Sequence, residues 1–77
     1  MAHFHFNFRS PENMVLDEEG VDLLDVGAAR EEALASAREI LANAIKTGTV
    51  PPPYSIVITD ASGRAMATIT VKDVFQS

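Results

Sequence analysis

The sequence predicts a single small α+β domain, residues 1–77, in which one amphipathic helix covers one face of an antiparallel sheet of about four strands. Three observations predict this class. Polar and aromatic side chains alternate near the N-terminus, a long central segment has helical periodicity, and a β-rich hairpin pattern follows near the C-terminus. The predicted order is hairpin, helix, hairpin, or ββαββ.

The first hairpin is predicted over residues 3–16. The alternation places Phe4, Phe6 and Phe8 on one face of a strand and His3, His5 and Asn7 on the other, solvated face. Proline and asparagine in residues 10–13 favour a turn, after which residues 14–16 return as a short strand. A second turn at residues 17–20 ends in glycine, and residues 21–24 then lead in extended form to the helix.

The helix is predicted over residues 26–46. Asp25 is a favourable N-cap, and Gly48 followed by three prolines ends the helix. Many apolar positions are alanines, so the helix can approach the sheet closely, with the three phenylalanines filling the space. The apolar arc contains Val26, Ala29, Ala33, Leu34, Ala37, Ile40, Leu41, Ala44 and Ile45.

The second hairpin follows a stiff connector made by the prolines at 51–53. Residues 54–59 are rich in β-branched side chains, residues 60–63 form a D-x-x-G turn, and residues 64–71 return. Phe75 is expected at the edge of the core. The sheet face away from the helix is then expected to expose His3, His5, Asn7, Ser55, Val57, Thr59, Met66, Thr68 and Thr70.

Composition narrows the function classes. The chain has no cysteine and a formal net charge of −5, which disfavours disulfides, thiolate metal sites, nucleic acid and anionic membranes. No apolar run is long enough to cross a bilayer, and the first residues lack a signal-peptide pattern, so a cytoplasmic location is expected. A domain of 77 residues without disulfides or a structural metal is only marginally stable. A homodimer is therefore also expected, through the open face or an edge strand.

His3 and His5 form the one metal-like pattern. Residues i and i+2 of a strand point the same way, so both imidazoles can reach one ion. The chain has no third histidine, and no carboxylate is placed beside the pair by its spacing. The alternative is that both histidines lie on the solvated face.

Arg30 interrupts the apolar arc of the helix near its N-terminus. One interpretation is that its guanidinium pairs with Asp17, Glu18 or Glu19 and so pins that turn to the helix. The other is that its aliphatic stem lies along the core while the charge reaches water.

Several segments resemble a family of short bacterial proteins of unknown function. They are the aromatic start HFHFNF at 3–8, DEEGVDL at 17–23, AAREEAL at 28–34 and TDASGR at 59–64. The resemblance implies a small conserved domain and no catalytic residues. The helix sequence EEALASARE at 31–39 also resembles HicB-type antitoxins, which implies binding of a basic partner protein.

These features favour a non-enzymatic protein–protein interaction domain, homodimeric or bound to a basic partner protein, with no cofactor. The alternative is a domain that binds a small ligand or a metal on the open sheet face with His3 and His5. An enzyme is disfavoured, because no acid–base or nucleophilic constellation is recognisable in the sequence.

Overall fold

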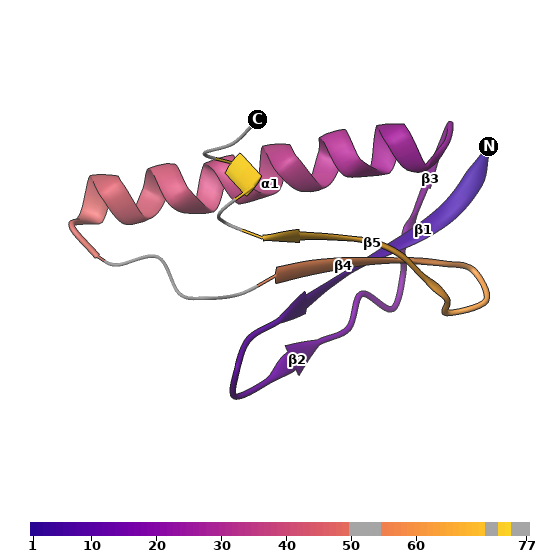
Figure 1. Cartoon of the computed structure of the whole chain (residues 1–77), viewed down its shortest axis with the longest axis horizontal. Coiled ribbons are helices and arrows are strands. Elements are labelled where there is room, and N and C mark those ends of the chain that lie inside the picture. Colours follow the sequence, from indigo (N-terminus) through magenta and orange to yellow (C-terminus); the bar gives the residue numbers. More distant parts are fainter. Residues whose placement is uncertain (50–54, 71–72, 75–77) are drawn as a thin grey trace.

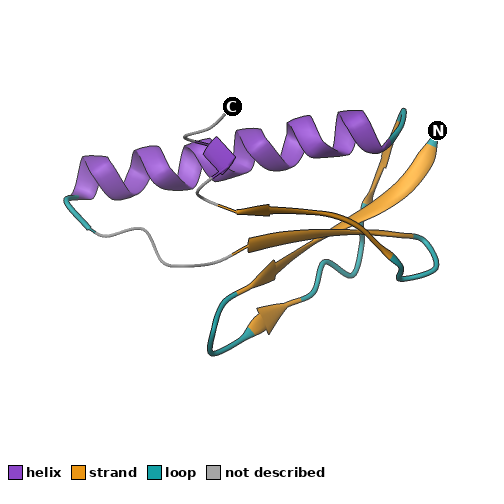
Figure 2. Cartoon of the chain, viewed as in Figure 1, coloured by secondary structure: helices purple, strands orange, loops and turns teal. Residues whose placement is uncertain are grey.

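The computed structural model describes residues 1–49, 55–70 and 73–74, and in them one long helix packs on one face of a five-stranded antiparallel sheet (Figures 1 and 2). This confirms the predicted α+β class. In chain order the elements are β1 (Ala2–Arg9), β2 (Met14–Val15), β3 (Val21–Leu23), α1 (Val26–Thr47), β4 (Ser55–Asp60) and β5 (Ala65–Thr70).

Strand β1 lies inside the sheet and joins the two hairpins. The strand order is β2-β1-β4-β5, and β3 also pairs with β1. β2 lies opposite the end of β1, with Phe8 facing Val15, and β3 lies opposite its start, with His3 facing Asp22. The returning strand of the first hairpin is therefore divided in two by the loop at residues 16–20, which is why the sheet has five strands rather than about four.

The second hairpin has the predicted turn. The Oδ1 atom of Asp60 accepts hydrogen bonds from the Ser62 amide at 3.0 Å, the Ser62 hydroxyl at 2.6 Å and the Arg64 amide at 3.0 Å. Gly63 has a φ of +88°, which a glycine adopts without strain. β4 pairs with β1 on one side and β5 on the other, and its Ile56, Val57 and Ile58 are all buried.

Helix α1 has both predicted caps. The Asp25 carboxylate accepts the Ala28 amide at 2.8 Å, and Gly48 ends the helix with a φ of 73° while its amide bonds to the last turn. Ala29, Ala33 and Ala37 are almost fully buried, which confirms the close approach of the helix to the sheet.

The facing side chains differ from those expected. The largest fully buried side chains are Ile56, Ile58 and Ile69 of β4 and β5, whereas of the three phenylalanines in β1 only Phe4 is buried. Phe6 and Phe8 are partly buried against the core. The helix lies over β4 and β5 rather than over β1, so the isoleucines take the place assigned to the phenylalanines. Ile45, expected in the buried arc, is 71% exposed and lies outside the core cluster.

The proline connector at 51–53, Tyr54, Val71 and Phe75 lie outside the described residues. Among the described residues, no helix is both long and apolar enough to cross a membrane.

Candidate functional site

The loop at residues 16–20 folds back over the sheet face that lies opposite the helix. Its anchor is Asp17, whose carboxylate accepts the Phe6 amide at 3.1 Å and the Gly20 amide at 3.1 Å. The Asp17 carbonyl accepts a hydrogen bond from Nδ1 of His5 at 2.6 Å. This face is therefore partly covered rather than fully solvated, because the loop lies on the polar side chains of β1.

Asn7 is buried under this loop, with 5% of its surface exposed, although the alternation of the strand predicts a solvated side chain. Its Oδ1 accepts the Asp17 amide at 3.0 Å. Its Nδ2 donates to the Val57 carbonyl at 3.2 Å and to the Thr59 hydroxyl at 3.3 Å. One amide side chain thus connects the loop, β1 and β4. Val57, the cross-strand neighbour of Asn7, is buried as well, which corrects its predicted exposure.

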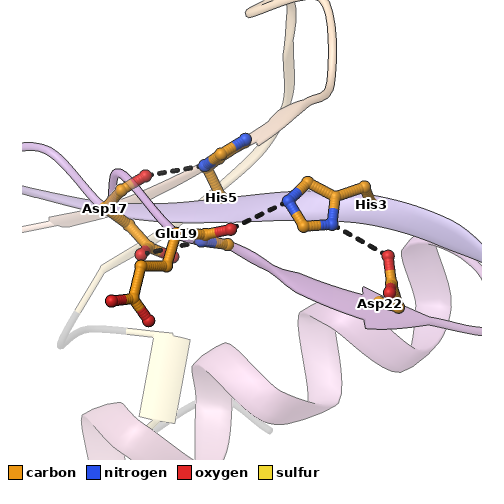
Figure 3. Close-up of polar contacts among 6 residues, drawn as sticks. His3, His5, Asp17, Glu19 and Asp22 are labelled. Carbon is orange, nitrogen blue, oxygen red and sulfur yellow. Dashed lines mark hydrogen bonds and ion pairs between the residues drawn. The ribbon is translucent and has the colours of Figure 1, made fainter.

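His3 connects β1 to both the loop and β3 (Figure 3). Its Nδ1 lies 2.8 Å from the Asp22 carboxylate, and its Nε2 lies 2.9 Å from the Glu19 carbonyl. The hydrogen bond to Asp22, followed by that to Glu19, raises the pKa of His3 above its usual 6.5. Because both partners are acceptors, the doubly protonated imidazolium is the form that completes both contacts.

His5 lies edge-to-face against His3, with ring centroids 5.0 Å apart. Only its Nδ1 has a hydrogen-bond partner among the described residues, the Asp17 carbonyl. A neutral imidazole protonated on Nδ1 satisfies that contact, so the two neighbouring histidines differ in what they require of their protonation state.

Gly20 allows the loop to approach β1 this closely. Its φ is +71°, and a Cβ placed there would lie 2.5 Å from Nε2 of His3 and 2.7 Å from the Phe4 carbonyl oxygen. Both the backbone conformation and the available space therefore require glycine.

Two carboxylates near this face are held in the anionic form. Burial alone would raise the pKa of Asp17, but hydrogen bonds from the Gly20 and Phe6 amides, with nearby His5, outweigh it and hold that pKa below its usual range. The Ser62 hydroxyl, followed by the Arg64 amide, lowers the pKa of Asp60 to about 2. Both side chains are negatively charged throughout the physiological pH range.

The expected ion pair of Arg30 with Asp17, Glu18 or Glu19 does not form among the described residues. Arg30 is exposed on α1, and the only two ion pairs of the described part of the chain are His3–Asp22 and Arg64–Asp60. The loop is pinned to β1 by backbone groups and histidines instead, because it folds onto the sheet face that α1 does not cover.

The geometry does not favour a metal at His3 and His5. Both ring nitrogens of His3 and one of His5 already contact protein acceptors. No group of three or more His, Cys, Asp and Glu residues in the described ranges is arranged to hold an ion.

A band of apolar and acidic side chains follows the outer edge of the sheet, along β2, the loop and β3. We call it the acidic edge. Its five apolar members are between 39% and 74% exposed, and its carboxylates are interleaved with them. It contains Met14, Val15, Leu16, Asp17, Glu18, Glu19, Val21, Asp22 and Leu24.

An open pocket of about 400 Å³ lies between the acidic edge and the β4–β5 turn. Leu16 and Met14 contribute apolar surface, and Glu18, Asp17 and Asp60 contribute carboxylates. His5 also lines this pocket. The arrangement suits a ligand with both an aliphatic and a cationic part, because apolar wall and negative charge occur side by side.

Sequence reasoning identified His3, His5, Asp17 and Glu19 as notable but missed what joins them. The missed residues are Asn7, Asp22 and Gly20. The D-x-x-G spacing of residues 17–20 was a usable signal. It predicts a turn in which the aspartate side chain bonds to its own turn, and the glycine, which has no Cβ, can then pack closely against another segment.

The sequence matches the family model of a domain of unknown function (DUF6894) over residues 3–72. No curated protein and no solved structure matches the chain, so the resemblance to HicB-type antitoxins is not shown. The match agrees with the resemblance to a family of unknown function.

Proposed function

The chain belongs to the DUF6894 family of domains of unknown function, and we propose that it is a non-enzymatic interaction domain that binds a basic protein through the acidic edge. The observation that carries this proposal is the exposure of large apolar side chains among carboxylates along one edge of the sheet. Leu16 is 62% exposed, Val15 60% and Leu24 74%. Clustered exposed apolar residues are typical of surfaces that contact another molecule.

The charge of this edge favours a basic partner. Six of the eleven acidic residues of the chain lie between positions 12 and 25, and no lysine or arginine lies between Arg9 and Arg30. The six are Glu12, Asp17, Glu18, Glu19, Asp22 and Asp25. A second copy of the chain would bring the same charges together, whereas a basic surface would be attracted and oriented by them.

The geometry of the edge favours contact through side chains. β2 has two residues and β3 three, with the loop between them, so neither offers a long row of free backbone groups to a partner strand. The pocket beside the loop supports the same view, because its apolar and carboxylate lining suits a lysine or arginine side chain.

The test compares three baits in affinity capture from the native lysate at low and high salt. They are the unchanged protein, the double variant Leu16→Ser/Glu18→Gln, and the matched control Ile45→Ser/Glu39→Gln on the exposed side of α1. We expect the unchanged protein and the control to capture the same basic protein in stoichiometric amounts. The edge variant should lose it, and higher salt should weaken it because charge contributes to the contact.

Equal capture by the edge variant would refute a role for the acidic edge. Circular dichroism spectra of the three baits serve as the folding control, since Leu16, Glu18, Ile45 and Glu39 are all exposed.

Self-association is the second candidate, and one observation supports it at the opposite edge. β5 has no charged residue and no proline, and among the described residues it pairs on one side only, with β4. Edge strands of this kind are prone to pair with a copy of themselves, and an antiparallel β5–β5 contact would continue the sheet across a two-fold axis.

Light scattering coupled to gel filtration tests this contact. If β5 pairs with a second copy, Thr68→Lys should convert a dimer to a monomer, because two lysines would meet near the centre of the contact. Ala42→Lys on the exposed side of α1 adds the same charge and should leave the mass unchanged. A monomeric unchanged protein, or a dimeric Thr68→Lys variant, would rule the β5 contact out.

A further inference from the structure

His3 contacts two acceptors at once, one through each ring nitrogen. Nδ1 lies 2.8 Å from the Asp22 carboxylate on β3, and Nε2 lies 2.9 Å from the Glu19 carbonyl in the loop. A neutral imidazole has one N–H and one lone pair, so it can donate to only one of these two oxygens, and its other nitrogen would face an acceptor lone pair. Only the imidazolium makes both hydrogen bonds.

We propose that the His3 imidazolium holds the acidic edge against β1 in a pH-dependent manner, and that its deprotonation releases the loop at residues 16–20. We call its two hydrogen bonds the clamp, and the loop held by them the seated loop. The clamp is a property of the free domain. A role of the clamp in regulating partner binding rests on the proposed function, because the loop carries Asp17, Glu18 and Glu19 of the acidic edge.

The carboxylates that face His3 support this direction. Asp22 faces it from β3, and the Asp17 carboxylate lies close enough in the loop to stabilise the cation. On its own strand the neighbour is His5, which contacts the loop with a single nitrogen. That contact needs only one N–H, which both protonation forms of the His5 ring can supply, so His3 is the group whose protonation the seated loop requires.

The direction of the pH dependence of the seated loop follows from the raised pKa of His3. The seated state binds the proton more tightly than the released state, so protonation stabilises the seated loop fully below the ordinary pKa of 6.5. This stabilisation is lost as the pH rises through the raised pKa. For each unit by which the pKa is raised, the equilibrium between seated and released loop changes by about tenfold.

Amide hydrogen exchange between pH 6 and 9 tests the clamp in the unchanged protein, without any partner. The Phe6 and Asp17 amides report loop seating because each bonds across the contact between the loop and β1, Phe6 to the Asp17 carboxylate and Asp17 to the Asn7 side chain. The Ile58 amide in enclosed β4 reports global unfolding. We expect the protection factors of Phe6 and Asp17 to fall with rising pH, by up to about tenfold per unit of raised pKa, while that of Ile58 falls less.

Two substitutions locate the effect. Asp22→Asn should move the midpoint of the protection change to lower pH, and His3→Gln should abolish the pH dependence. His5→Gln, the matched control, should lower protection of the loop while keeping the midpoint. Imidazole ¹⁵N shifts of His3 should titrate with the same midpoint as the loop amides.

A His3 midpoint at or below 6.5, or an unchanged pH profile in His3→Gln, would overturn the clamp. Asp22 is 68% exposed at its side chain, so Asp22→Asn keeps the test decisive even where His3→Gln fails to fold. These measurements need no partner, so failure of the clamp and failure of partner capture are separate results.

Discussion

Replacing Gly20 with alanine should lower the free energy of unfolding by about 3 kcal/mol. Two independent causes add. The φ of +71° is unfavourable for any residue with a Cβ, and that Cβ would lie 2.7 Å from the Phe4 carbonyl oxygen of the backbone. The neighbouring His3 ring can rotate away, but the backbone of a central strand cannot.

Gly48→Ala is the matched control for this prediction. Gly48 has a nearly identical φ of +73°, and a Cβ there would meet nothing within 4 Å. It should therefore show the conformational effect alone, about 1–2 kcal/mol. Urea denaturation followed by circular dichroism measures both variants. Equal losses of unfolding free energy at the two positions would mean that the loop does not pack closely against β1 in solution.

Asn7→Ala should lower the free energy of unfolding by about 2–3 kcal/mol, although it removes only a small polar side chain. The substitution leaves the Asp17 amide, the Val57 carbonyl and the Thr59 hydroxyl without the partner that Asn7 provides. Val57 is buried, so water cannot readily replace the lost hydrogen bond at that carbonyl. The loss should appear in denaturant unfolding and in reduced exchange protection of the Asp17 amide.

The control for Asn7 is Asn43→Ala on the exposed face of α1. Asn43 is exposed, and alanine has the higher helix propensity, so this change should be within about 0.5 kcal/mol of neutral or slightly stabilising. If Asn7→Ala were as mild as Asn43→Ala, the bridge between the loop and β4 would contribute little to stability.

Asn7 also shows where prediction from the sequence reaches its limit. The alternation of residues 3–8 placed Asn7 on the face opposite the phenylalanines, and that placement agrees with the hydrogen bonds of Asn7 to the loop. The alternation could not show that the face is covered at this point. Burial of Asn7 depends on a loop ten residues later in the chain folding back over the strand, and periodicity within one strand carries no information about such a contact.

Arg30 shows the same limit for a contact that was predicted from the sequence and does not form. Its position on the helical wheel and the run of acids at 17–19 suggested an ion pair, but charge alone does not determine which sheet face a loop covers. The loop lies on the face away from α1, where His3, His5, Asn7 and the backbone amide of Phe6 hold it. Opposite charges at the surface attract weakly, and buried backbone groups that need partners outweigh them.

The sequence alone determined the elements whose causes are local. Strand β1, the Asp25 and Gly48 caps of α1, its closely packed alanines and the Asp60–Gly63 turn all follow from neighbouring residues, and each is present. Tertiary structure alone decided which strands pair, that β2 and β3 share one edge of β1, and that His3 lies between Asp22 and Glu19. The physical reason is that capping and periodicity depend on residues a few positions apart. Strand order and loop placement depend on the packing of segments that are distant in the chain, where many arrangements bury similar apolar surface.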